Sequence, residues 1–164
     1  QAGVADGTIY LYFKNKEDIL ISLFEEKMGE FVEKIEDEIA GVKSASEKLS
    51  LLINKHFDIL SSDPHLAIVT QLELRQSNKE LRLKINDVLK GYLALVDSVL
   101  REGMENGEFK SDLNYKLARQ MIFGTLDEIV TTWVMNEQKY QLQSLSDDIH
   151  NLIIAGLAQA EKKS

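Results

Sequence analysis

The sequence predicts an all-α protein, and three observations support this fold class. The 164-residue chain has one proline and nine glycines, too few for the many turns of an all-β domain of this length. After the first dozen residues, apolar side chains recur every three or four positions, which is the helical period. Hydrophobic residues make up 44% of the chain, enough for a buried core. We therefore expect a bundle of helices.

The first long helix is expected from Lys16 to about Ala40. Most of its glutamates lie off the apolar stripe and form a solvated acidic face. Gly41 ends this helix, and Ser44 or Ser46 is placed to cap the next one. The apolar stripe of the first helix contains Leu20, Phe24, Met28, Phe31, Ile35 and Ile39.

Residues 62–64 break the second helix, which has an apolar stripe of its own. Asp63 suits the cap of a third helix, and Pro64 suits its first turn. Proline has no backbone N–H, but at the first position of a helix this group would have no helical partner in any case. This third helix is expected to continue to Gln76. A fourth helix, with a wide apolar stripe, is expected over residues 79–106 and stops where Gly107 follows.

The last two helices are the most apolar of the chain. Asp112 or Asn114 is placed to open the fifth helix, which has little polar circumference, and a final helix is expected over residues 146–162. A bundle of this size does not bury so much apolar surface by itself. We therefore expect a homodimer formed through these two last long helices.

Charge and cysteine content exclude several classes of protein. The formal net charge is -8, with 19 Lys and Arg against 27 Asp and Glu, which argues against a protein that coats nucleic acid. The absence of cysteine excludes disulfides, thiolate metal sites and a cysteine nucleophile, and fits the cytoplasm. No apolar run is long enough to span a membrane. The first residues include neither an initiator Met nor a signal peptide, so we expect a chain that lacks its natural beginning.

No pattern in the sequence indicates an enzyme. The three histidines, His56, His65 and His150, are isolated from one another, and His56 lies on an apolar stripe where a packed core residue is expected. No phosphate-binding loop, dinucleotide fingerprint or nucleophile elbow is present. We expect no catalytic residues, no metal site and no cofactor.

The first twenty residues, QAGVADGTIYLYFKNKEDIL, are the most informative segment. They resemble the second half of the helix-turn-helix of TetR-family transcriptional regulators, in which a short recognition helix of the form A-G-V-x-x-G-T-[IL]-Y-x-x-F precedes K-x-K-E-x-[IL]. The spacing agrees with this, because Ile9 and Phe13 share one face and leave the residues between them to face DNA. We expect a tight turn at residues 2–4, and residues 1–24 as the end of a DNA-binding domain.

The resemblance implies a DNA contact for seven residues of this segment. Gly7 lets the backbone approach DNA, the hydroxyl groups bind bases and phosphates, and the lysines bind phosphates. Ala5 and Asp6 depart from the usual capping and basic residues of the family, and most of the helix-turn-helix is absent, so we expect weak DNA binding from this chain alone. The expected DNA-binding residues are Gly7, Thr8, Tyr10, Leu11, Tyr12, Lys14 and Lys16.

The resemblance implies that residues 25–164 bind an effector and form the dimer. Segments 70–78 and 124–133 are similar to family members that repress fatty acid degradation genes and are released from operator DNA by long-chain acyl-CoA. Such a ligand requires an apolar tunnel for its chain and cations for its phosphates. Candidate tunnel residues, besides Phe31, are Phe57, Leu60, Val69, Leu72, Leu89, Tyr92, Leu93, Val96, Phe123, Leu126 and Trp133; candidate cations are Arg75, Arg82, Lys90, Arg101 and Arg119.

Two other functions fit the same sequence. The chain is also compatible with a TetR-type regulator of efflux or metabolism that senses another hydrophobic molecule. A helical ligand carrier, or an interaction module without DNA binding, is an alternative from a different class. In the leading hypothesis, ligand binding moves the recognition helices of a dimer away from the spacing of two operator half-sites, with the helix that begins at Lys16 as the hinge.

Overall fold

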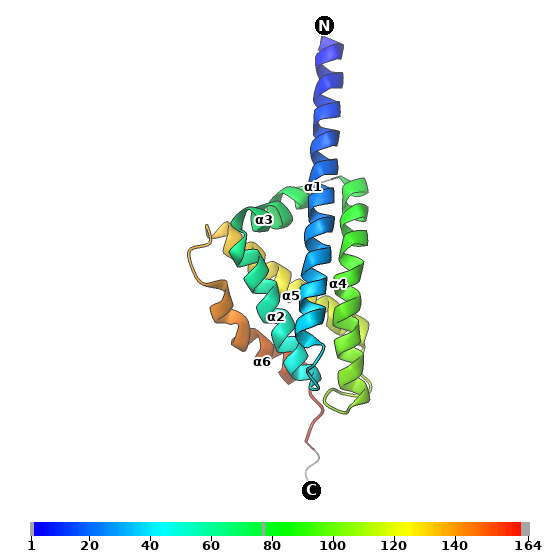
Figure 1. Ribbon diagram of the computed structural model, residues 1–164, viewed down its shortest axis with the longest axis vertical. Helices are drawn as coiled ribbons and strands as arrows, with labels where there is room; N and C mark the ends of the chain where they lie inside the picture. Colours follow the sequence, from blue (N-terminus) through cyan, green and yellow to red (C-terminus); the bar gives the residue numbers. More distant parts are fainter. Residues whose placement is uncertain (1, 77, 162–164) are drawn as a thin grey trace.

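The computed structural model describes residues 2–76 and 78–161, and for residues 2–6, 9–14 and 76 it describes the backbone alone (Figure 1). The expected all-α fold is confirmed. Among these residues, no helix is both long and apolar enough to cross a membrane. The helices are α1 (Ala2–Ile39), α2 (Ala45–Ser62), α3 (Pro64–Ile68), α4 (Lys79–Glu105), α5 (Tyr115–Met135) and α6 (Ser146–Leu157), with short turns η1 (Val69–Glu73), η2 (Leu74–Gln76) and η3 (Leu142–Leu145).

Helix α1 begins earlier than the sequence predicted. The tight turn at residues 2–4 and the boundary before Lys16 are absent, because a single helix runs from Ala2 to Ile39. Figure 1 shows the beginning of α1 extending beyond the rest of the bundle. A helix-turn-helix turn depends on packing between its helices, and no other helix of the described chain packs there. Local helical hydrogen bonds therefore continue without a break.

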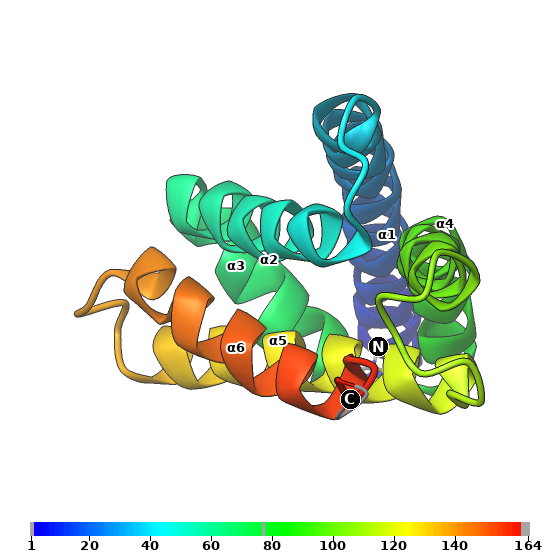
Figure 2. The same cartoon turned by 90° about the horizontal axis from the view of Figure 1, so that it is seen from below.

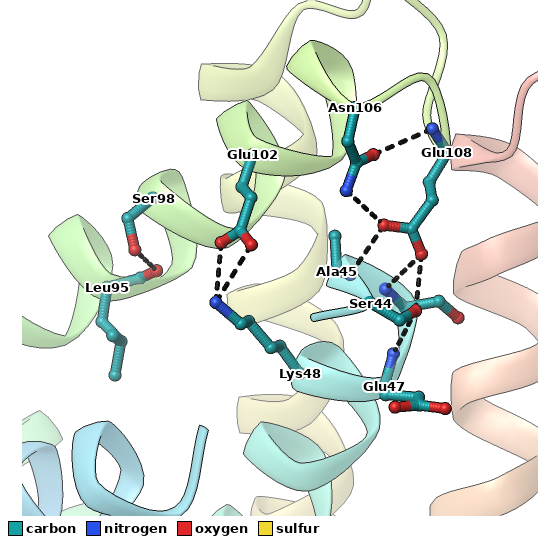
Figure 3. A network of polar contacts seen from close by, with 10 residues as sticks. Ser44, Ala45, Glu47, Lys48, Leu95, Ser98, Glu102, Asn106 and Glu108 are labelled. Atoms are coloured by element: carbon teal, nitrogen blue, oxygen red, sulfur yellow. Dashed lines mark hydrogen bonds and ion pairs between the residues drawn. The ribbon is translucent and has the colours of Figure 1, made fainter. Parts of the chain in front are cut away.

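Helices α1, α2 and α4 form the centre of the bundle. Figures 1 and 2 show α4 beside the second half of α1 and running in the same direction. Helix α2 returns between them and α6, while α5 packs against α4 and α2. Lys48 of α2 and Glu102 of α4 form an ion pair of 2.8 Å, which joins two of these helices (Figure 3).

Four helices begin where side chains in the sequence can cap them. Ser44, Asp63, Asn78 and Asn114 each accept a hydrogen bond from a backbone N–H three residues further on, at 2.9 to 3.3 Å. Each cap satisfies a backbone donor that has no helical partner and contributes roughly 1 kcal/mol. The predicted cap Asp63 is confirmed, and of the alternatives that the sequence left open the structure selects Ser44 rather than Ser46 and Asn114 rather than Asp112.

The Glu108 carboxylate adds a second cap to α2. It accepts hydrogen bonds from the Ser44 hydroxyl at 2.6 Å, from the backbone N–H groups of Ala45 and Ser46 at 2.7 and 3.3 Å, and from the Asn106 amide at 2.6 Å (Figure 3). Burial raises the pKa of Glu108, but these hydrogen bonds outweigh it and hold the pKa below its ordinary value. The loop after α4 thereby fixes the start of α2.

The segment after Pro64 differs from the single helix expected up to Gln76. Helix α3 ends at Ile68, a π-helical turn occupies Val69–Glu73, and a 3₁₀ turn follows as Leu74–Gln76. The π turn contains Gln71, whose buried side chain bonds α5. A widened turn of this kind is frequent at functional sites, and the apolar period of the sequence does not reveal it.

Helix α6 is shorter than the sequence suggested and ends at Leu157, before the expected Lys162. Ala158 leaves the helix to form a β-bridge with Phe109. The Lys110 N–H donates to the Leu157 carbonyl and the Gln159 N–H donates to the Glu108 carbonyl, at 2.9 and 3.0 Å. The Ala158 N–H still donates to the Ile154 carbonyl, but the Leu157 carbonyl and the Gln159 N–H bond the distant loop in place of the partners that a longer helix would give them.

Two apolar clusters form the interior of the bundle. The larger joins α1, α2, α4, α5 and α6 around fully buried residues such as Leu52, Phe57 and Val96. The smaller lies nearer the start of α4 and contains Phe24, Leu74 and Leu81. Each buried side chain of this size contributes about 1.5–3 kcal/mol relative to exposure, so the two clusters hold the helices together.

Candidate ligand-binding site

A cavity of about 340 Å³ lies where the two apolar clusters meet, because residues of both clusters line it. Its volume is at the lower end of the roughly 300–1,000 Å³ typical of small-molecule sites. Helices α1, α2, α4 and α5 and the segment from α3 to η2 contribute the walls. The lining residues are Phe24, Lys27, Met28, Phe31, His56, Ile59, Leu60, Leu66, Thr70, Gln71, Leu74, Arg75, Arg82, Ile85, Asn86, Leu89, Tyr92, Phe123 and Asp127.

His56 and Tyr92 form a buried polar pair in the wall of the cavity. The His56 Nδ1 lies 2.9 Å from the Tyr92 hydroxyl, and the Phe31 ring packs edge-on against His56 at 5.6 Å. Burial lowers the pKa of His56 to about 4, although the charge of Asp127 opposes this. Burial, and then Asp127, raise the pKa of Tyr92. At neutral pH both groups are therefore uncharged and suited to hydrogen bonding with a ligand.

Gln71 joins the π turn to α5 through a second polar cluster. Its amide Nε2 donates to the Asp127 carbonyl at 3.0 Å, the Asp127 carboxylate Oδ1 at 3.1 Å and the Thr131 hydroxyl at 2.8 Å. The Arg75 guanidinium forms an ion pair with the same Oδ1. Because Gln71 is 5% exposed, these bonds satisfy a polar group that would be costly to bury alone.

The lining of the cavity carries a local excess of positive charge. Lys27, Arg75 and Arg82 contribute cations, and Asp127 is the one carboxylate among the lining residues that the structure describes. Within the described chain, Lys27 pairs with Glu30 and Arg75 with Asp127, whereas Arg82 forms no ion pair. The chain as a whole has a net charge of -8, so this cluster is a local exception that favours an anionic group.

The structure brings some of the expected ligand residues together. Phe31 lines the cavity as expected. Five more of the expected residues also line it, from four helical segments: Leu60, Arg75, Leu89, Tyr92 and Phe123.

The other expected tunnel residues lie elsewhere in the bundle. Phe57, Val96, Leu126 and Trp133 are buried in the larger cluster, and Leu72 and Leu93 pack against that cluster. Val69 packs against the smaller cluster. All lie on apolar stripes, but a stripe on a helix with several neighbours has more than one buried side, and only one side meets the cavity.

Three of the five candidate cations lie outside the cavity lining. Arg119 pairs with Asp97 at 2.8 Å, and Lys90 pairs with Asp87 at 2.6 Å on the surface. Arg101 is exposed near the end of α4. The two that line the cavity are Arg75 and Arg82.

Several lining residues were missed by the sequence reasoning. Lys27, Gln71, Asn86 and Asp127 line the cavity although none was a candidate. Gln71 and Asp127 had a usable signal, since each is a polar residue beside the apolar positions of its helix and within a segment already singled out by its resemblance. His56 is also a polar residue on an apolar stripe, although it lies outside those segments, and the expectation of a packed core residue agrees with its bond to Tyr92.

All seven expected DNA-binding residues lie on the extended start of α1. Gly7, Thr8 and Lys16 are exposed there. The side chains of Tyr10, Leu11, Tyr12 and Lys14 lie outside the part that the structure describes. Their assignment therefore stays a prediction, as does the domain boundary after residue 24, which falls within α1.

Two family models divide the chain between them. Residues 1–23 match the model of bacterial regulatory proteins of the tetR family, and residues 24–156 match the C-terminal region of YsiA-like proteins, also a TetR model. The second match alone covers most of the chain. The chain belongs to the TetR family of bacterial transcription regulators and is not an enzyme.

Individual relatives are more specific. The chain is 64% identical over 157 residues to the fatty acid metabolism regulator protein of Bacillus subtilis strain 168, which covers 96% of this chain and 81% of the relative. It also resembles two solved structures, the fatty acid degradation regulator FadR from Bacillus halodurans and FadR from Bacillus subtilis in complex with stearoyl-CoA. Both have a TM-score of 0.84, with 62% and 65% identity, and cover 95% of this chain and 84% of theirs.

Proposed function

We propose that the protein is a repressor of fatty acid degradation genes that a long-chain acyl-CoA releases from DNA. The observation that carries the proposal is the apolar cavity with Lys27, Arg75 and Arg82 among its lining. It occurs in a chain that is 65% identical to a regulator solved with stearoyl-CoA. Because such a regulator acts on bacterial genomic DNA, we place it in the cytoplasm.

The cavity suits both parts of an acyl-CoA. Its lining is largely aliphatic and aromatic, and each buried CH₂ of an acyl chain contributes about 0.8 kcal/mol to binding. The phosphates of CoA require cations, and Arg75 and Arg82 supply guanidinium groups whose fork matches phosphate. Neutral Tyr92 and His56 suit the uncharged thioester better than a charged group.

Helix α1 connects the cavity with the DNA-binding segment. Phe24, Met28 and Phe31 of α1 line the cavity, and residues 2–23 of the same helix lie within the segment that matches the tetR-family model. A ligand that favours a different position of these side chains shifts the angle of α1. Release requires only that the ligand prefer the position in which DNA binding is lost.

The effector is tested by titrating the chain with stearoyl-CoA in a calorimeter. We expect binding by the wild type and about three- to tenfold weaker binding by Arg82→Gln, because a charge-assisted contact with phosphate is lost. Lys90→Gln is the matched control, since Lys90 lies on the same helix but outside the cavity. Absence of stearoyl-CoA binding would favour a regulator that senses another hydrophobic molecule.

Repression is tested in a fusion protein that carries a TetR-family helix-turn-helix segment in front of residue 1. Gel shifts on promoter DNA should show a complex that stearoyl-CoA dissolves, and Tyr10→Ala or Lys16→Ala should weaken the complex. Stearoyl-CoA that binds without releasing DNA would contradict the repressor mechanism. Failure to bind any promoter would favour the carrier or interaction module.

We also propose that the homodimer forms through α5 and α6. Leu117 and Met121 of α5 and Leu152 of α6 are 52%, 65% and 77% exposed, large fractions for apolar side chains. Met121→Glu with Leu152→Glu should convert the dimer to a monomer in sedimentation experiments. Leu83→Glu, an exposed position on α4, should leave the dimer intact. Loss of the dimer in the control alone would place the interface elsewhere.

A further inference from the structure

Arg75 faces a competition within the cavity lining. It is one of three lining cations, and the carboxylate of Asp127, also a lining residue, already pairs with it. The other lining cations lack this arrangement, because Lys27 pairs with Glu30, outside the lining, and Arg82 forms no ion pair within the described residues. An anionic ligand group that binds Arg75 therefore competes with Asp127 for this guanidinium.

Asp127 has a second partner, Gln71, that lowers the free-energy cost of losing the ion pair with Arg75. The Gln71 amide donates to Oδ1 of Asp127, the same atom that Arg75 contacts, and also to the Asp127 carbonyl. When Arg75 turns away, Asp127 keeps a hydrogen bond from a buried donor. The Arg75 side chain is 44% exposed, so water also screens the ion pair that is broken.

We propose that Asp127 acts as an internal counter-ion that occupies Arg75 until a phosphate on a long apolar tail displaces it. The proposal rests on the proposed function, since it assigns a phosphate-bearing effector to the same cavity. Asp127 then sets the affinity for the head group without contacting it. Its role is to position Arg75, so that an anion binds in the cavity only if its affinity and concentration are high enough to displace the Asp127 carboxylate. While Arg75 binds the ligand, the hydrogen bond from Gln71 keeps the Asp127 carboxylate in place, so that the ion pair forms again when the ligand leaves.

The test compares three ligands with the same 18-carbon tail and different heads: stearoyl-CoA, octadecyl phosphate and 1-monostearoylglycerol. Asp127→Asn keeps the shape of the side chain and an oxygen for Gln71 but removes the charge that holds Arg75. We expect this variant to bind the two phosphate ligands about two- to fivefold more tightly and the uncharged glyceride unchanged. Thr131→Val is the control, because it removes another acceptor of Gln71 and leaves the Arg75–Asp127 pair. It should not bind the phosphate ligands more tightly relative to the glyceride.

A double-mutant cycle locates the effect at Arg75. The gain should vanish when Asp127→Asn is combined with Arg75→Gln, because the released cation is then absent. Equal or weaker phosphate binding by D127N would overturn the proposal. So would an equal gain for the glyceride, or a gain that persists without Arg75.

The two proposals fail in different ways. If wild type does not bind stearoyl-CoA but D127N tightens binding of octadecyl phosphate, the acyl-CoA function is wrong and the counter-ion role stands. If stearoyl-CoA binds to wild type and D127N brings no gain, the function stands and the counter-ion role is wrong. If neither the wild type nor D127N binds a phosphate ligand, both are overturned.

Discussion

Gly103, near the end of α4, leaves room for the ring of Phe109. A Cβ at this glycine would lie 2.1 Å from Cδ2 and 2.4 Å from Cε2 of Phe109, far inside van der Waals contact. The ring cannot move freely, because Phe109 is 2% exposed and its N–H donates to the Gly103 carbonyl at 2.9 Å. The same residue forms the β-bridge to Ala158. Gly103→Ala must therefore displace the buried ring of a residue whose backbone bonds both α4 and Ala158.

The size of the effect follows from two opposing contributions. Glycine to alanine within a helix ordinarily stabilises by about 0.5–1 kcal/mol, because alanine loses less backbone entropy on folding. Forcing a methyl group into a packed core costs typically 1–3 kcal/mol, and more if the ring is expelled. We expect a net loss of about 2 kcal/mol. For a chain of this length that corresponds to a melting temperature lower by roughly 4–8 °C.

Gly91→Ala is the matched control on the same helix. A Cβ there would meet Val32 Cγ2 at 4.0 Å, an ordinary contact. This variant should be stabilised by about 0.5–1 kcal/mol. Urea and thermal unfolding at one protein concentration measure both, since a dimer makes the midpoint depend on concentration.

A third variant tests the cause. Phe109→Leu introduced into G103A should recover part of the lost stability, although Phe109→Leu alone destabilises, because the smaller side chain relieves the overlap. Wild-type stability of G103A, or the same change in G103A and G91A, would refute the assigned contact. Additive losses in the double variant would show that Gly103 and Phe109 do not interact.

Three further predictions follow from the caps and the cavity. The pKa of His56, about 4 in the folded chain because of burial, lies below the ordinary 6.5, so the unfolded chain takes up the proton first. Stability is complete above about pH 6.5 and falls by up to roughly 3 kcal/mol towards pH 4; His56→Gln should flatten this part of a pH series of urea unfolding. Glu108→Gln weakens the cap of α2 and should cost about 1 kcal/mol at pH 7. Because hydrogen bonds hold the pKa of Glu108 below its ordinary value, its contribution is lost as pH falls, and a difference from wild type that is unchanged in acid would contradict the cap. In calorimetry with acyl-CoAs of 14 to 18 carbons, each added CH₂ should tighten binding about fourfold while it is buried, and a flat series would exclude the cavity as the site of the chain.

Local chemistry explains which parts of the fold were predictable. Ser44, Asp63 and Asn114 cap helices as expected, because an N-cap needs only one side chain and the N–H group three residues away. The stop at Asn106 and Gly107 is equally local, since Gly107 has a φ of 83°, which glycine adopts at little cost.

The errors share a different cause. The helix after Pro64 changes to a π turn where Gln71 reaches α5, and α6 ends where residues 158–159 bond the loop after α4. Helix α1 continues through the expected turn because no other part of the described chain packs against its beginning. In each case a partner far away in the sequence, or its absence, decides the backbone.

The sequence by itself determined the helical class, most helix starts and the family, because these depend on residue types at short, fixed spacings. It also placed Arg75 and Arg82 among the candidate cations. Only the tertiary structure decided which side of each apolar stripe meets the cavity, and that Gln71 and Asp127 lie beside Arg75. An apolar stripe indicates that a side chain is buried, but the way the helices cross decides which neighbour buries it. Arg75 and Asp127 are 52 positions apart in the sequence, so no local pattern could indicate their contact.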